Sequence, residues 1–236
     1  MMTGQGIQVA NRLYPLTNLA TGKEIPVRRW NDGQLPEVPE FRAGDGYNKH
    51  RVRPINLMVW HWTGGEQDPI AMAEVLRQRK LGVEFSISRS GTVYQFCDPA
   101  EVDTADSGSV NSRSVGCEIV CYGYRSVWDL EHAFGIPKLG LDRELYPALT
   151  HGHEVDTAKF YTCQVQAALA LATAVGTALP TIKRQVPGAA FSVLPPEGIA
   201  GFSGHIGHFH LTDKKRDPGP WFMDQLRYWF DATGVA

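Results

Sequence analysis

Residues 204–220 bring together side chains that could do metal chemistry. Their sequence, GHIGHFHLTDKKRDPGP, contains His208 and Asp217, whose imidazole and carboxylate groups are both zinc ligands in proteins. Lys215 comes two residues before Asp217, so its ammonium group would lie beside a metal held there. The Pro-Gly pair after Asp217 predicts a turn that sets the direction of the carboxylate. A catalytic zinc needs three protein ligands and one open position, so a third ligand is expected from elsewhere.

His61 is the best candidate for the third ligand. It lies in VWHWTGG, near the end of an apolar run over residues 55–63 that is typical of a strand buried on both faces. Two glycines then stop the strand and leave room for a ligand. The alternative is a core histidine with no role in binding. Other histidines compete as ligands: His205 and His210 in the C-terminal stretch, and His151 and His153 in a long loop.

Glu118 is the candidate general base. In SVGCEIVCY, over residues 114–122, strand alternation puts Cys117, Ile119 and Cys121 on one face and Glu118 on the other. A glutamate inside an apolar strand is costly unless it is paired or used. Burial would raise its pKa toward the range of a working base. The alternative is a structural ion pair with an Arg or Lys.

Composition and charge narrow the possible classes of protein. The chain has 236 residues, and 43% of them are hydrophobic, which is enough for one large core. Its formal net charge of −2 argues against nucleic acid or an anionic membrane as partner. No apolar run approaches the ~18 residues of a membrane span. The N-terminus lacks the pattern of a signal peptide, which predicts synthesis in the cytoplasm.

The remaining pattern alternates strands and helices. It predicts helices over residues 68–82, over 162–180 with Thr162 as the cap, and from residue 220, with a hairpin over 83–96 and a polar loop over 98–113. We expect an extended N-terminal arm at residues 1–50 and one domain at 51–236, with loop insertions at about 123–160 and 183–201. The four cysteines are expected to be buried free thiols: Cys97, Cys117, Cys121 and Cys163.

In this order the motifs resemble those of the zinc-dependent N-acetylmuramoyl-L-alanine amidases, which include phage amidases and peptidoglycan-recognition proteins. The ordered motifs are strand-HWTGG, the hairpin SISRSGTVYQF, SVGCEIV, a long helix and GHFHLTDKKRDPGP, over residues 55–232. The resemblance implies an α/β fold with a mixed central sheet flanked by helices. It implies zinc held by His61, His208 and Asp217, with Glu118 and Lys215 as catalytic residues. The implied partner is peptidoglycan or a soluble muropeptide.

The chain also departs from the family pattern. It has His61-Trp62-Thr63 where the family often has His-His-Thr or His-Tyr-Thr. After the hairpin, the family often has Trp-His-Ala-Gly where this chain has Ala105-Asp106-Ser107-Gly108, so the contact of that histidine is not implied here. Some members carry the base on an earlier strand, which makes Glu84 the alternative to Glu118.

The resemblance predicts hydrolysis of the amide bond between N-acetylmuramic acid and L-alanine. The first expectation is a cell-wall lytic enzyme of the endolysin type, which would reach the wall by a phage or prophage release route. The alternatives are a cytosolic amidase that recycles muropeptides, a recognition module that does not cleave, and a virion-associated protein. The residue chemistry alone supports only zinc-assisted hydrolysis of an amide or ester.

Overall fold

The computed structural model describes residues 6–31, 45–49, 54–125, 143–188 and 192–233. A six-stranded mixed sheet forms its centre, in the order β12-β5-β9-β6-β7-β3. The pairs β12–β5, β5–β9, β9–β6 and β7–β3 are parallel, and β6–β7 is the antiparallel hairpin. The strands of this sheet are β3 (Val27–Arg29), β5 (Leu57–Trp62), β6 (Phe85–Ile87), β7 (Val93–Gln95), β9 (Ser114–Ile119) and β12 (Gly204–Gly207).

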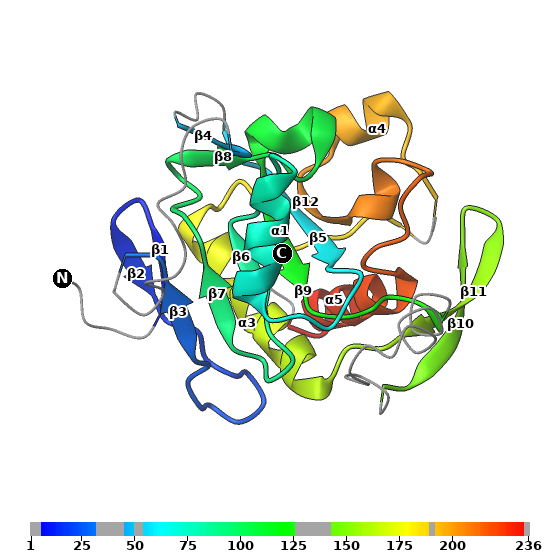
Figure 1. The fold of residues 1–236 in the computed structure, drawn as a ribbon, viewed down its shortest axis with the longest axis horizontal. Coiled ribbons are helices and arrows are strands. Elements are labelled where there is room, and N and C mark those ends of the chain that lie inside the picture. The colour runs from blue at the N-terminus through cyan, green and yellow to red at the C-terminus, as the bar shows by residue number, and fades with distance from the viewer. Residues whose placement is uncertain (1–5, 32–44, 50–53, 126–142, 189–191, 234–236) are drawn as a thin grey trace.

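Helices cover both faces of the sheet, so the expected α/β architecture is confirmed (Figure 1). Helix α1 crosses in front, and α3 and α5 lie behind. The apolar strand residues alternate accordingly: Met58 and Trp60 pack with α3 and α5, whereas Leu57 and Val59 pack on the opposite side. The helical elements are α1 (Pro69–Gln78), η1 (Gly108–Arg113), α3 (Thr162–Ala178), α4 (Pro196–Gly201), η2 (His208–His210) and α5 (Pro220–Thr233).

Three small two-stranded pairs surround the central sheet. Strand β3 lies at the edge of that sheet, so part of the expected N-terminal arm pairs with the domain, while residues 1–5, 32–44 and 50 of the arm lie outside the described residues. The division at residue 50 stays a prediction. The pairs are β1 (Ile7–Val9) with β2 (Arg12–Tyr14), β4 (Tyr47–Lys49) with β8 (Val102–Thr104), and β10 (Leu145–Thr150) with β11 (His153–Ala158).

Several local predictions need correction. The stretch 98–113 is not only loop, because it contains β8 and η1. Tyr161 rather than Thr162 is the N-cap of α3, and its backbone N–H donates to the Gln164 side chain. Cys163 is exposed, whereas the other three cysteines are buried as expected. The insertion at 123–160 contains the β10–β11 hairpin, and its residues 126–142 lie outside the described residues, as do 189–191 of the second insertion.

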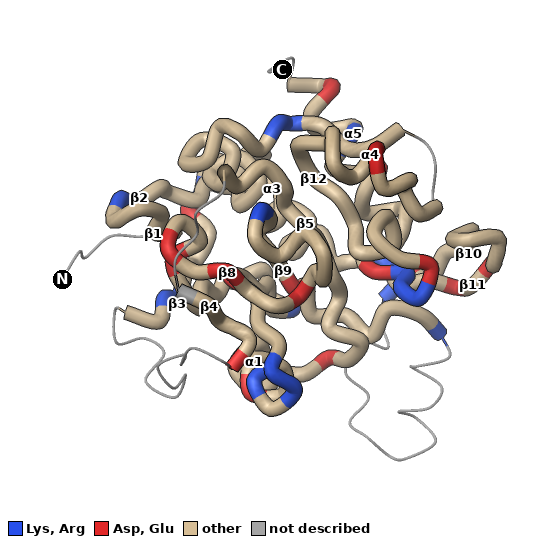
Figure 2. The backbone as a smooth tube through the Cα atoms, turned by 90° about the horizontal axis from the view of Figure 1, so that it is seen from above, with Lys and Arg blue, Asp and Glu red and all other residues tan. Residues whose placement is uncertain are grey.

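Two general properties bear on the partners of the protein. None of the described helices combines the length and apolar character that crossing a bilayer requires. Charged residues of both signs are interspersed along the described chain rather than separated by sign (Figure 2). This distribution agrees with the small formal net charge of −2.

Candidate metal centre

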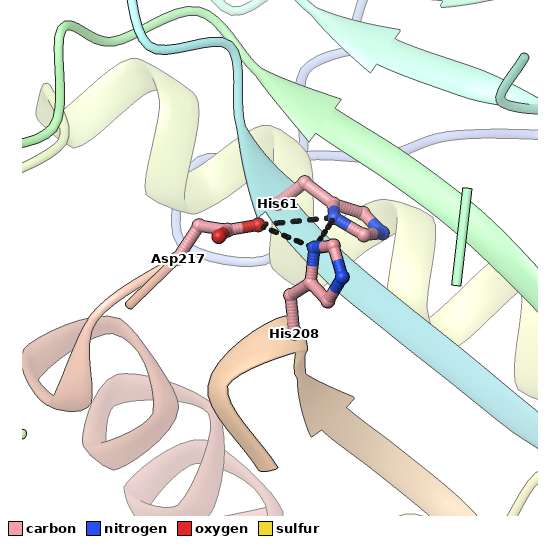
Figure 3. A group of neighbouring side chains, drawn as sticks. All are labelled: His61, His208 and Asp217. Carbon is pink, nitrogen blue, oxygen red and sulfur yellow. Dashed lines mark hydrogen bonds and ion pairs between the residues drawn. The ribbon is translucent and has the colours of Figure 1, made fainter. Parts of the chain in front are cut away.

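The side chains of His61, His208 and Asp217 point toward one another although they come from separate segments (Figure 3). The Nδ1 atoms of His61 and His208 are 2.9 Å apart. The Oδ2 atom of Asp217 lies 3.0 Å from His61 Nδ1 and 3.1 Å from His208 Nδ1. The structure therefore brings together the three residues expected to hold a metal.

This donor set fits zinc. Zinc takes imidazole nitrogen and carboxylate oxygen at bond lengths near 2.0–2.2 Å, so ligand atoms on one tetrahedral ion are about 3.3 Å apart. The three observed separations, 2.9 to 3.1 Å, are close to that value. His61 and Asp217 are buried, whereas His208 is half-buried at a cleft. A metal here would have protein on one side and the cleft on the other.

Strand pairing explains why distant residues meet at this point. β12 runs parallel to β5 with Gly207 opposite Trp60, so the next residues, His208 and His61, come to the same end of the sheet. Asp217 is tied to this turn because its carbonyl accepts from the Phe209 N–H. Gly207 is required for this close packing, since a Cβ there would lie 2.7 Å from both the Phe209 ring and Pro218.

The other ring nitrogen of His61 faces a carboxylate that the sequence pattern did not predict to be part of the site. His61 Nε2 lies 3.2 Å from Asp106 Oδ2 and 3.4 Å from the Ser107 hydroxyl oxygen. Asp106 follows β8, in the stretch that was expected to be a polar loop. The signal that could have identified it was its position, because an aspartate stands there where the family pattern often has histidine.

Glu118 lines the same cleft as the three candidate ligands. Its Oε2 atom is buried and has no hydrogen-bond partner among the described residues. Burial raises the pKa of Glu118 to about 8; the charges of Asp217 and Asp106 add to the rise, and His61 opposes it. In the metal-free protein this carboxyl group therefore keeps its proton near neutral pH, and a cation bound nearby would favour the ionised form that can act as a base.

Lys215 lines the cleft as well, on the exposed stretch 213–215 that precedes Asp217. The tip of the β10–β11 hairpin supports this segment, because His151 Nε2 lies 2.9 Å from the carbonyl oxygen of Lys215. The cleft has a volume of about 530 Å³, and Arg79, Lys214 and Arg216 also contribute to its wall. The two residues predicted to be catalytic therefore share one cleft with the three predicted ligands.

The competing candidates lie elsewhere. The fully buried His205 accepts from the indole N–H of Trp60 at 3.2 Å, on the far face of β12. His210 Nδ1 accepts from the Gly207 N–H at 2.9 Å. His153 is exposed in the hairpin. Glu84 is fully buried, and its Oε2 accepts from the Gly116 N–H and the Thr104 hydroxyl, both at 2.7 Å.

Of the three clustered groups, His61 binds a proton most tightly when no metal is present. Burial lowers the pKa of His61, but hydrogen bonds with Asp106 and Asp217 outweigh this and raise it to about 10. Burial lowers the pKa of His208, partly offset by its bond with Asp217. Burial raises the pKa of Asp217, but the two histidines hold it below its usual range. A metal ion would therefore displace a proton from His61 on binding.

Comparison with known proteins finds a family model and solved structures that are similar to this chain. Residues 51–220 match the family model of the N-acetylmuramoyl-L-alanine amidases. The amidase LysC from Clostridium intestinale URNW is similar in structure, with a TM-score of 0.51 at 13% identity over 87% of this chain and 97% of that chain. The endolysin amidase LysCS from the same organism gives a TM-score of 0.50 at 14% identity over 89% and 99%.

These two likenesses support the fold alone. No curated protein sequence matches the chain. The family model, in contrast, covers well over half of the chain, including all three residues of the His-His-Asp cluster and both Glu118 and Lys215. The chain therefore belongs to the N-acetylmuramoyl-L-alanine amidase family.

Proposed function

We propose that this protein is a zinc-dependent amidase that cuts the bond between N-acetylmuramic acid and L-alanine in the bacterial cell wall. The observation that carries the proposal is the convergence of two imidazole nitrogens and a carboxylate oxygen within 3.1 Å of one another at the cleft that contains Glu118 and Lys215. Membership of the family supports the amide bond as the target.

His61, His208 and Asp217 would hold the zinc ion. When bound, zinc supplies a Lewis acid that polarises an amide carbonyl and lowers the pKa of water. Glu118 lines the cleft and would take a proton from the attacking water, then deliver that proton to the leaving amine. Lys215 would stabilise the negative charge that develops on the amide oxygen.

A carboxylate on an enclosed strand suits this role. Glu118 lines the cleft, and its buried Oε2 has no hydrogen-bond partner among the described residues. The surrounding acidic groups favour the protonated form, whereas a nearby cation favours the ionised form. Glu118 could therefore gain and lose a proton within one reaction cycle.

We propose cell-wall lysis, of the endolysin type, as the role of this activity. The test uses purified sacculi and metal-loaded protein, with turbidity and newly formed N-terminal alanine as the two readouts. We expect the turbidity to fall and N-terminal alanine to appear. A chelator should stop both changes, and added zinc should restore them. Binding to walls without release of alanine would instead favour a recognition module.

A comparison of substrates separates lysis from recycling. Intact sacculi and soluble muropeptides would be offered at matched concentrations of the muramoyl-alanine bond. Preference for sacculi supports the lytic role. Cleavage confined to soluble muropeptides would overturn that role while leaving the amidase chemistry in place.

A further inference from the structure

We infer that Asp106 is the positioning residue for His61, holding the ring so that its Nδ1 atom faces the metal centre. This inference rests on the proposed function of the site. Asp106 is not a ligand candidate itself, because it lies beyond the ring, on the nitrogen opposite the cluster. It would act through His61, whose orientation and tautomer it would determine.

The geometry of the ring supports this role. Nδ1 of His61 faces His208 and Asp217, while Nε2 lies 3.2 Å from Asp106 Oδ2. A carboxylate only accepts, so the contact with Asp106 requires hydrogen on Nε2. A bound metal would replace the hydrogen that Nδ1 shares with Asp217 and use the Nδ1 lone pair. Partners of this kind, beyond the ligands, orient metal-bound histidines and make them better donors.

The surroundings hold the carboxylate in place. The Asp106 side chain is only 5% exposed, and the Ser107 hydroxyl donates to its Oδ2 at 2.9 Å. The Thr104 hydroxyl lies 3.3 Å from Oδ1 and 2.7 Å from Glu84, to which it gives its proton. Glu84, the alternative base, thus helps to hold the segment 104–107 that carries Asp106.

A glycine in the neighbouring strand provides the space. A Cβ at Gly116 would lie 1.9 Å from Asp106 Oδ2 and 2.7 Å from its Cγ. The carboxylate therefore occupies the volume that any other residue at position 116 would fill. The backbone N–H of Gly116 donates to Glu84 at 2.7 Å, so strand β9 supports both acidic groups.

The test measures zinc release from the loaded protein into an excess of a chromophoric chelator. The release rate reports only the loaded site. We expect Asp106→Asn to release zinc about 10–100-fold faster than the parent protein, because loss of such a partner typically costs that factor in metal affinity. Asp231→Asn removes the same charge from an exposed position on α5, away from the cleft, and its release rate should be unchanged.

A spectroscopic readout separates positioning from general support. In zinc-loaded protein labelled with ¹⁵N-histidine, His61 should show a bonded proton on Nε2, shifted downfield by the carboxylate. Asp106→Asn should move that signal upfield while His208 keeps its own. An unchanged His61 signal, or equal release rates for the Asp106 and Asp231 variants, would overturn the inference.

Two further arms keep the outcomes distinct. Ser107→Ala removes one hydroxyl and keeps the carboxylate, so it should speed zinc release measurably but by less than Asp106→Asn. This variant still tests the inference if Asp106→Asn does not fold. If the parent protein binds no zinc, both this inference and the proposed function fail. If the parent binds zinc and cleaves walls but Asp106→Asn changes only KM, Asp106 contacts substrate instead and only this inference fails.

Discussion

Glu118 lies directly opposite His61 in the parallel pairing of β9 with β5. Residues paired in this way point to the same face of the sheet, which here is the face that carries the cleft. A shift of one residue in either strand would send one of the two side chains into the apolar layer against α3 and α5. The register of two central strands therefore sets the distance between a candidate base and a candidate ligand.

Glu118→Gln tests the base directly. The amide is nearly isosteric but cannot accept a proton, so kcat should fall about 10²–10⁴-fold. The zinc content should stay at that of the parent protein, because Glu118 is not one of the three clustered ligand atoms. Metal analysis and the rate of alanine release check this, with Glu154→Gln on the exposed side of β11 as control. A fully active Glu118→Gln protein would exclude Glu118 as the base.

Lys215→Met tests stabilisation of the developing charge. Loss of one group that stabilises an oxyanion typically lowers kcat about 10²–10³-fold. Lys214→Met is the matched control, since both lysines are exposed and line the same cleft. Steady-state kinetics on a soluble muramoyl-peptide separate the two. If both variants lose activity equally, the lysines contribute general charge only.

The histidines of the C-terminal stretch should separate into different roles. His208→Ala should abolish stoichiometric zinc binding, because a zinc site loses one of its three protein ligands. His210→Ala should retain zinc but lower the free energy of unfolding by about 1–3 kcal/mol, since the buried Gly207 N–H loses its acceptor. Zinc titration and urea unfolding check the pair. Zinc binding that survives in His208→Ala but not in His210→Ala would reverse the assignment.

His205 should make the protein sensitive to acid. Burial lowers its pKa to about 3, from about 6.5 when unfolded. The unfolded chain therefore binds more protons between these values, and the contribution to stability, complete above pH 6.5, is lost as the pH falls. From pH 7 to pH 5 the loss should be about 2 kcal/mol.

His205→Gln removes this titration and keeps an oxygen that can accept from the Trp60 indole N–H. Unfolding by urea, with chelator present, should then show a pH dependence about 2 kcal/mol weaker than that of the parent protein. His153→Gln, at an exposed hairpin position, should leave the dependence unchanged. Equal slopes for the parent and His205→Gln would show that His205 does not carry the effect.

Much of the framework could be predicted because the local pattern expresses it directly. The apolar run that contains His61 forms β5, the Ser90-Gly91 turn joins the β6–β7 hairpin, and Pro220 begins α5 as predicted. These features depend on side-chain periodicity and turn chemistry over a few residues. The N-cap of α3 lies one residue before the predicted Thr162, because the ends of helices depend on hydrogen bonds that residue spacing does not reveal.

By itself, the sequence determined which residue types could bind a metal and which strands would carry them. Its ordered motifs also indicated the family. Only the tertiary structure decided that His208, rather than His205 or His210, faces His61, and that Asp106 lies behind the ring. The reason is physical: strand order and register bring residues 45 to 156 positions apart within about 3 Å, and no local pattern contains those distances.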